Sequence, residues 1–237
     1  EAGGDERQRA EIAMDVAVHV GHRLIRTDAG LDWIAVAEAI AARLERPDAL
    51  RAELERARGG VLYAAGRYAD SKRAHAEALR LLRARGALDP ADVAAQQVRL
   101  GGVMVDTGDV DEGVALLREA LGRYEELDVG GGRAAVAHNN LSNALTAQGE
   151  FEAAAEHAQR ALASFEAVRP ATHPDIAMAS NNLAIALASS GSFVESLEHF
   201  ERASVVWERH YGPEHPRVAT APGHLAAALF RGGRVEE

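Results

Sequence analysis

The chain has 237 residues, of which 5% are aromatic and none is cysteine, and its formal net charge is −10. An acidic chain lacks the basic surface that nonspecific nucleic-acid binding needs, and a chain without cysteine forms neither disulfides nor thiolate metal sites. No apolar run approaches the roughly 18 residues of a membrane span, and no signal peptide is present. We therefore expect a cytoplasmic protein with no nucleic-acid and no membrane partner.

The first 47 residues predict two helices. Apolar residues along one side of residues 5–26 indicate a first helix, and those of residues 31–44 indicate a second. Thr27-Asp28-Ala29-Gly30 between them has the composition of a turn with capping side chains. We interpret residues 1–47 as a degenerate helix pair that caps the repeats after it, because terminal repeats are often atypical.

From residue 48 onward the sequence repeats with a period of about 42 residues, which indicates a solenoid in which each copy is one supersecondary unit. A glycine between two amphipathic stretches marks each copy. The five equivalent glycines are Gly66, Gly108, Gly149, Gly191 and Gly233. The predicted copies cover residues 48–89, 90–130, 131–172, 173–214 and a truncated 215–237.

Each copy predicts two antiparallel helices around its glycine, which ends the first helix because the left-handed conformation costs glycine little. Small residues recur seven positions before the glycine and five and twelve positions after it. They allow the two helices to approach closely. The predicted helices span 48–65 and 68–85, 91–107 and 110–127, 133–148 and 151–168, 175–190 and 193–210, and 217–232.

This pattern resembles the tetratricopeptide repeat. The residues that carry the resemblance are Leu100-Gly101, Leu141-Ser142 and Leu183-Ala184 in first helices, and Ala78-Leu79, Ala120-Leu121 and Ala161-Leu162 in second helices. The usual period of this family is about 34 residues, and each copy here is about eight residues longer. The longer copies and the connectors His173-Pro174 and His215-Pro216 look like the kinesin-light-chain type. The resemblance covers about residues 48–237. It implies an all-α fold, a right-handed α-solenoid (superhelix) of antiparallel helix pairs.

The sequence contains no motif of a catalytic or cofactor site. The HExxH, GxSxG, Walker and dinucleotide-binding patterns are all absent. His157 and His199 lie one repeat apart, which marks them as features of the repeat. His19 and His22 lie three residues apart on a helix, but a zinc site needs three or four converging ligands. We therefore predict that the chain is not an enzyme and has no cofactor and no metal site.

In tetratricopeptide arrays the first helices line a concave groove, so the resemblance implies a peptide-binding site there. The residues expected to point into the groove are Arg56, Tyr63, Arg99, Asn139, Asn140, Asn143, Asn181, Asn182, His224 and Arg231. Asparagine offers both a donor and an acceptor to an extended peptide backbone. In kinesin-light-chain-like arrays asparagines at this place hold peptides, and that role carries over to Asn140 and Asn182 only. The alternative is that these asparagines satisfy the neighbouring helix.

We predict a protein–protein interaction scaffold that binds a peptide or partner segment of unknown identity in this groove. Its arginines, with few acids beyond Asp106, favour a neutral or mildly acidic ligand. Two alternatives stay open: a regulatory or sensor arm of a larger bacterial signalling enzyme, such as a serine/threonine kinase, and a self-assembly segment that forms a homo-oligomer through the solenoid ends. The chain starts without methionine and stops inside a repeat, so we expect a piece of a longer protein.

Overall fold

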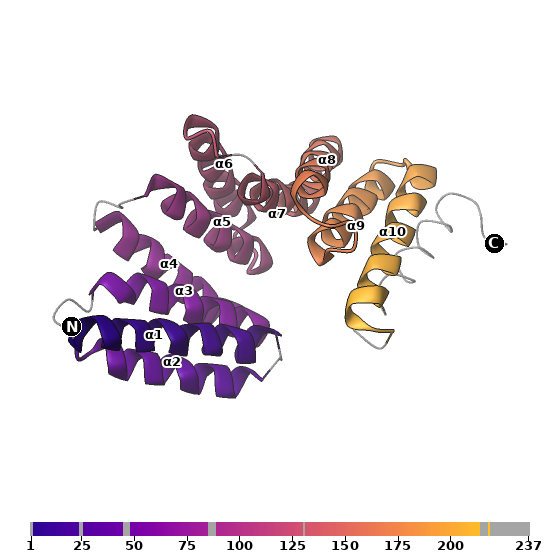
Figure 1. Cartoon of the computed structure of the whole chain (residues 1–237). Coiled ribbons are helices and arrows are strands. Elements are labelled where there is room, and N and C mark those ends of the chain that lie inside the picture. Colours follow the sequence, from indigo (N-terminus) through magenta and orange to yellow (C-terminus); the bar gives the residue numbers. More distant parts are fainter. Residues whose placement is uncertain are drawn as a thin grey trace. The chain divides into compact units, whose positions relative to one another are not determined.

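The computed structural model describes residues 2–23, 26–44, 48–84, 89–129, 131–213 and 218. Within these ranges it contains ten α-helices, one π-helical turn and no strand, so the predicted all-α class is confirmed (Figure 1). The chain divides into two compact units, residues 1–116 and 117–237, and the boundary falls within helix α6 (Val110–Glu126). No helix in the described ranges has the length and apolar character that crossing a membrane requires.

The N-terminal pair consists of α1 (Ala2–Val18) and α2 (Thr27–Ala41), with the π-helical turn η1 (His19–Arg23) after α1. The prediction of a turn at residues 27–30 is wrong, because these residues form the start of α2. The reason is a tertiary contact. A Cβ built on Gly30 would lie 2.6 Å from the Cα of Gly21, so two glycines allow η1 and α2 to meet at their backbones.

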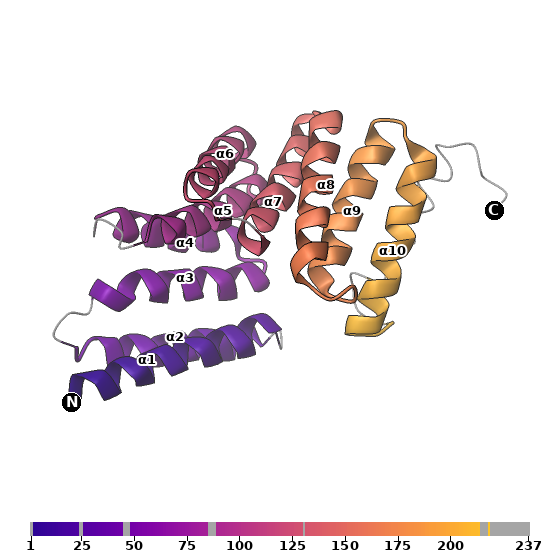
Figure 2. The ribbon, with the colours of Figure 1, turned by 45° about the horizontal axis from the view of Figure 1, so that its top comes forward.

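Helix α3 (Asp48–Ala64) packs on this pair and begins the regular repeats. Leu50 and Leu54 of α3 share one buried apolar cluster with Met14 of α1 and Ile34 of α2. The salt bridge between Arg58 of α3 and Glu38 of α2 adds a polar contact at the same junction. Figure 2 shows α1, α2 and α3 lying side by side in this part of the first unit.

The remaining helices follow the predicted order. They are α4 (Tyr68–Ala84), α5 (Pro90–Asp106), α6 (Val110–Glu126), α7 (Gly132–Gln148), α8 (Phe151–Val168), α9 (Pro174–Ser189) and α10 (Phe193–Tyr211). From α3 to α10 the predicted boundaries differ from the observed ones by no more than one residue. The predicted helix at residues 217–232 lies outside the described residues. We call α3, α5, α7 and α9 the first helices and α4, α6, α8 and α10 the second helices.

The helix pairs turn and pack as the repeat pattern predicts. Four repeat glycines adopt positive φ after the first helices: Gly66 (+71°), Gly108 (+90°), Gly149 (+82°) and Gly191 (+94°). The small residues of the second helices are fully buried at the predicted contacts within each unit: Ala78, Ala161 and Ala203. In the second unit α7, α8, α9 and α10 stand side by side in sequence order (Figure 2). Phe165, Ile176 and Leu183 belong to the apolar core that α7, α8 and α9 share.

Candidate functional site

The predicted groove residues of the first unit lie on α3 and α5, and we call Arg56, Tyr63 and Arg99 the arginine surface. All three side chains are exposed. The Tyr63 hydroxyl donates a hydrogen bond of 2.8 Å to Oδ2 of Asp106, which links the ends of two successive first helices. Partial burial raises the pKa of Asp106, and the bond from Tyr63 opposes this effect. The one acid predicted beside the arginines is therefore engaged by a tyrosine of the same surface.

A buried imidazole lies close to the arginine surface. His75 of α4 is 3% exposed, and its ring fits against Gly59 of α3, where a Cβ would lie 2.6 to 2.7 Å from three ring atoms. Nε2 of Gln96 donates to the carbonyl oxygen of His75 at 2.9 Å and lies 3.1 Å from its Nδ1. Burial, together with the charges of Arg99 and Arg56, lowers the pKa of His75 to about 4. The imidazole is thus neutral at pH 7, and both arginines lie near enough to influence it.

The predicted asparagines of the second unit lie on α7 and α9, and the structure separates them into two groups. Asn139 is only 3% exposed, and Nδ2 of Asn182 donates to its Oδ1 at 3.1 Å. This bond connects the first helices of two successive repeats. Asn143 is exposed, whereas Asn140 and Asn181 are half-buried. We call Asn140, Asn143 and Asn181 the asparagine surface. His224 and Arg231, the last two predicted groove residues, lie outside the described residues.

The structure also brings together two histidines that the sequence did not pair. His138 of α7 and His157 of α8 face each other within one repeat, with their Nδ1 atoms 2.8 Å apart and their ring centroids 5.1 Å apart. Burial lowers the pKa of His138 to about 4, helped by the charges of His157 and Arg160. Burial also lowers the pKa of His157, and Arg160 contributes. Both rings are therefore neutral at pH 7.

A sequence signal for this pair existed in the repeat register. His138 stands eleven residues before Gly149 and His157 stands eight after it, which are facing positions of a helix hairpin. The position eleven residues before the glycine is polar in four copies, where it holds Glu55, Gln97, His138 and Ser180. Comparing histidines across the hairpin, rather than one full repeat apart, would have found the contact.

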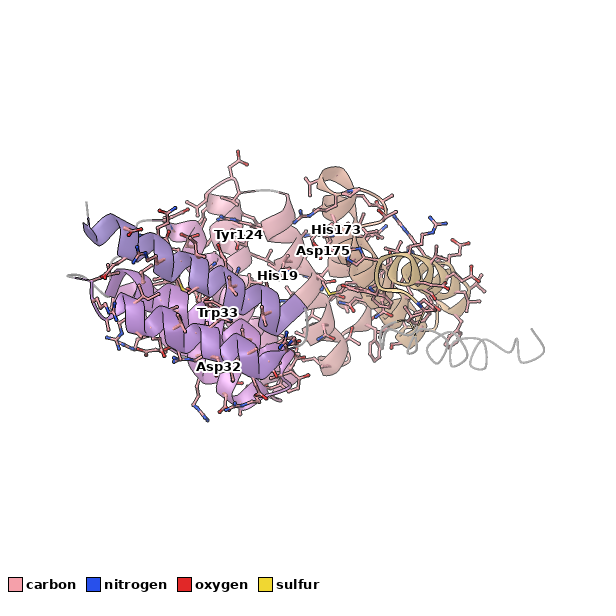
Figure 3. All side chains as sticks on the ribbon, turned by 60° about the horizontal axis from the view of Figure 1, so that its bottom comes forward. His19, Asp32, Trp33, Tyr124, His173 and Asp175 are labelled. Carbon is pink, nitrogen blue, oxygen red and sulfur yellow. The ribbon has the colours of Figure 1, made fainter. Side chains whose placement is uncertain are left out.

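One other polar cluster is structural. At the start of α9, Nδ1 of His173 accepts a hydrogen bond of 3.2 Å from the backbone N–H of Asp175 (Figure 3). Oδ2 of Asp175 lies 3.4 Å from the same Nδ1 and 3.8 Å from Nε of Arg169. Charge and hydrogen bonding here cap a helix whose first residue is Pro174.

A pocket of about 510 Å³ opens between α2, α3 and α4 of the first unit, and its lining includes none of Arg56, Tyr63 and Arg99. Its lining consists of Leu31, Glu55, Arg58, Leu62, Arg67, Asp70, Arg73, Ala74 and Glu77. The charges in it pair with one another: Nη1 of Arg58 lies 2.6 Å from Oε1 of Glu55, and Asp70 binds both Arg67 and Arg73. Such internally paired charges give the pocket no preference for a charged ligand.

Comparisons with known proteins agree with the repeat register. The sequence matches a family model described as "Tetratricopeptide repeat" over residues 92–167 and 175–237, which is more than half of the chain. A second model with the same description matches residues 139–204. No curated protein matches the sequence.

Three solved structures are similar in fold. A Rap protein complexed with Competence and Sporulation Factor has a TM-score of 0.77 at 17% identity, over 96% of this chain and 61% of that chain. A STAND protein with a tetratricopeptide repeat sensor from Pyrococcus horikoshii has a TM-score of 0.68 at 14% identity, over 96% and 34%. A putative kinesin light chain with TPR-like repeats from Podospora anserina has a TM-score of 0.63 at 17% identity, over 86% and 98%. The chain therefore spans less than two thirds of the Rap and STAND chains.

Proposed function

We propose that this chain, which belongs to the tetratricopeptide repeat family, is a non-catalytic protein-interaction scaffold whose first helices bind a peptide or a segment of a partner protein. The observation that supports this most directly is positional. Each of the four first helices keeps at least one polar side chain accessible between three and ten residues before its repeat glycine, while the second helices bury their small residues. Accessible polar side chains held on a rigid scaffold are a stronger functional hint than buried ones.

The charge of the arginine surface supports a neutral or mildly acidic ligand for the first unit. Arg56 and Arg99 are exposed, and the imidazole of His75 beside them is neutral at pH 7. The nearby carboxyl of Asp106 accepts a hydrogen bond from Tyr63. A guanidinium group presents several donors in a fixed plane and binds carboxylates in a bidentate way. We therefore assign carboxylate or carbonyl recognition to Arg56 and Arg99.

The amides of the asparagine surface support backbone recognition in the second unit. Asn140, Asn143 and Asn181 each offer a donor and an acceptor. The bond between Asn182 and Asn139 holds α7 and α9 in register, so that a rigid pair of helices carries these amides. An extended peptide alternates donors and acceptors and rises about 3.3 Å per residue. In this proposal Asn139 and Asn182 position the surface.

The test begins with peptides selected on the wild-type protein from a random displayed library, whose affinities are then measured by titration calorimetry. Each hydrogen bond contributes about 0.5–1.5 kcal/mol net. Since about 1.4 kcal/mol is a tenfold change, Asn140→Ala with Asn143→Ala should weaken binding about tenfold. Arg56→Ala with Arg99→Ala should weaken the binding of peptides that contain an acidic residue at least tenfold.

Matched controls on the second helices separate this effect from a general loss of charge or polarity. Arg80 of α4 and Gln159 of α8 are exposed, and Arg80→Ala with Gln159→Ala should leave the affinity unchanged. Equal loss in the control and the surface variants would contradict a site on the first helices. Full affinity in all variants with intact circular dichroism would place the ligand elsewhere on the protein.

A second candidate function is a sensor region of a larger signalling protein. The observation that favours it is the similarity to the STAND protein with a tetratricopeptide repeat sensor, of which this chain spans 34%. In that case the partner segment belongs to the same polypeptide. A longer natural polypeptide should then bind a selected peptide more weakly than this chain does, because its own segment competes. Equal affinity of both would argue against it.

A further inference from the structure

The pocket between α2, α3 and α4 lies where the first copy departs from the repeat pattern. Eight residues after its glycine this copy holds Ala74, whereas the next three copies hold larger residues: Leu116, His157 and His199. Eight residues before its glycine it holds Arg58, whereas every later copy holds leucine. Both residues line the pocket, so a small and a charged side chain stand there in place of the usual packing.

The two other arginines of the pocket, Arg67 and Arg73, are also particular to this copy. One residue after the glycine the next three copies hold Asp109, Glu150 and Ser192, and seven residues after it they hold Ala115, Glu156 and Glu198. The repeat fold therefore does not require an arginine at either place. A ligand gives a reason for these arginines that the fold does not.

The end of the pocket near the turn carries an excess of positive charge. Asp70 stands four residues after Gly66, and its carboxylate is shared by two arginines. Nε of Arg67 donates to Oδ2 at 2.9 Å, Nη2 of Arg67 donates to the same atom at 2.6 Å, and Nη2 of Arg73 donates to Oδ1. A guanidinium group has five N–H donors, so each arginine retains donors for a second carboxylate.

The other end carries an excess of negative charge. Glu55 stands eleven residues before Gly66, and one arginine is shared there by two carboxylates. Nη1 of Arg58 donates to Oε1 of Glu55 at 2.6 Å, and Nη2 donates to Oε1 of Glu38. Burial raises the pKa of Glu55, the charges of Glu38 and Glu77 add to this effect, and Arg58 opposes it. A second cation beside Glu55 would therefore be favourable.

We propose that this pocket binds a dipeptide with two free ends. Its carboxylate binds Arg67 and Arg73, and its ammonium group binds Glu55. An apolar side chain of the dipeptide contacts Leu31 and Leu62, which also line the pocket. A ligand with one charge of each sign suits a pocket whose own charges balance but whose ends differ. The volume of about 510 Å³ lies within the usual range for small-molecule sites.

The length of the pocket favours a dipeptide over a single amino acid. The seven residues from Glu55 to Leu62, which is level with the turn end, span about 10.5 Å along α3. An extended dipeptide spans about 6–7 Å at about 3.3 Å per residue, and the long side chains of glutamate and arginine cover the rest. The two charges of a free α-amino acid lie closer together and would reach only one end.

Titration calorimetry with the dipeptide Leu-Ala tests this site independently of the groove proposal, because no predicted groove residue lines the pocket. Wild type should bind one molecule, and N-acetylated Leu-Ala and Leu-Ala amide should each bind at least tenfold more weakly. Glu55→Gln, and Arg67→Gln with Arg73→Gln, should each lower the affinity for Leu-Ala at least tenfold. Ala74→Leu should do the same, because a leucine fills the pocket.

Arg118→Gln with Glu119→Gln is the matched control, since it removes one charge of each sign from exposed positions of α6, and it should bind as wild type does. Circular dichroism establishes that the variants are folded. Nuclear magnetic resonance of ¹⁵N-labelled wild type needs no variant: Leu-Ala should shift the backbone amides of Glu55, Leu62 and Arg73. No binding to wild type, equal affinity for the end-blocked peptides, shifts confined to other residues, or full affinity in folded Glu55→Gln would each overturn the proposal.

Discussion

Acidification should destabilise the first unit through His75, whose pKa is lowered to about 4 from an ordinary 6.5 because the ring is buried and lies near Arg99 and Arg56. As the pH falls below 6.5, the unfolded imidazole takes up a proton while the folded one stays neutral. The unfolded state therefore binds more protons between pH 6.5 and about 4, and it is favoured there. The contribution of neutral His75 to the free energy of unfolding is complete above pH 6.5 and is lost progressively as the pH falls to about 4.

The size of the effect follows from the difference between the two pKa values. At about 1.4 kcal/mol per pKa unit, the gap between 6.5 and about 4 corresponds to about 3 kcal/mol when both states are protonated. At pH 5 about 2 kcal/mol of this is already lost. A change of that size is a large fraction of the stability of a typical domain. Screening by solvent reduces this free-energy difference only slightly, because the side chain of His75 is 3% exposed.

Urea denaturation at several pH values between 7 and 5 measures this contribution. His75→Gln keeps a hydrogen-bonding side chain that does not titrate, so its free energy of unfolding should depend less on pH. Whatever stability the variant loses at pH 7, its difference from wild type should shrink by about 2 kcal/mol by pH 5. His210→Gln, at an exposed histidine of α10, should follow the wild-type curve. Parallel curves for wild type and His75→Gln would refute the reasoning, because they would mean that His75 titrates alike in both states.

Three further predictions concern backbone approach and the buried amide. Gly59→Ala should lower the free energy of unfolding, measured by urea denaturation, by about 1–3 kcal/mol, because its Cβ would meet the His75 ring. A Cβ on the neighbouring Gly60 meets open space, so Gly60→Ala should stabilise α3 by about 0.5–1 kcal/mol. Gly30→Ala should cost at least as much as Gly59→Ala, since its Cβ would meet the backbone of Gly21, and an unchanged melting temperature would contradict that contact. Asn182→Ala should lower the free energy of unfolding by about 1–3 kcal/mol, because it leaves Oδ1 of the buried Asn139 without its donor. Asn143→Ala should change it by no more than about 0.5 kcal/mol. Equal melting temperatures of the two variants would show that the bond contributes nothing to stability.

The regular helix pairs were predictable because one local requirement fixes each turn. A chain that reverses between two closely packed helices needs a residue with positive φ, and glycine adopts it without a steric cost. Gly66, Gly108, Gly149 and Gly191 all have positive φ at the predicted turns. Small residues at fixed distances from the glycine then determine which faces meet, and Ala161 and Ala203 are fully buried at those contacts. Local chemistry and long-range packing favour the same structure here, so the repeat pattern is sufficient to predict the helix pairs.

The start of α2 was not predictable, because there the local and tertiary signals disagree. Thr27, Asp28 and Gly30 are turn-forming and capping residues, so their order indicates a turn. In the structure Gly30 is buried within α2, where the absence of a side chain allows contact with Gly21. Sequence alone does not distinguish a glycine that terminates a helix from one that lets another segment approach it. The second case depends on a residue of another element.

The same distinction explains which part of the candidate site was predictable. The repeat register placed both asparagine pairs on the first helices, but neighbouring residues of a helix diverge by about 100° and do not share one face. One asparagine of a pair therefore turns toward the adjacent repeat, and Asn139 does so, with Asn182 as its donor. The assignment of Asn140, Asn143 and Asn181 to ligand binding stays a prediction.

The position eleven residues before the repeat glycine shows why a chemical site is harder to predict than the fold. Gln97 and Ser180 occupy it in two copies. Within the described residues the side-chain amide of Gln97 and the hydroxyl of Ser180 make no hydrogen bond. In the third copy the same position holds His138, and there the facing helix supplies His157. The fold depends on what the copies have in common, so it can be predicted from the period. A pairing such as that of His138 with His157 depends on two departures from the common pattern in one copy, and only the structure shows that they meet.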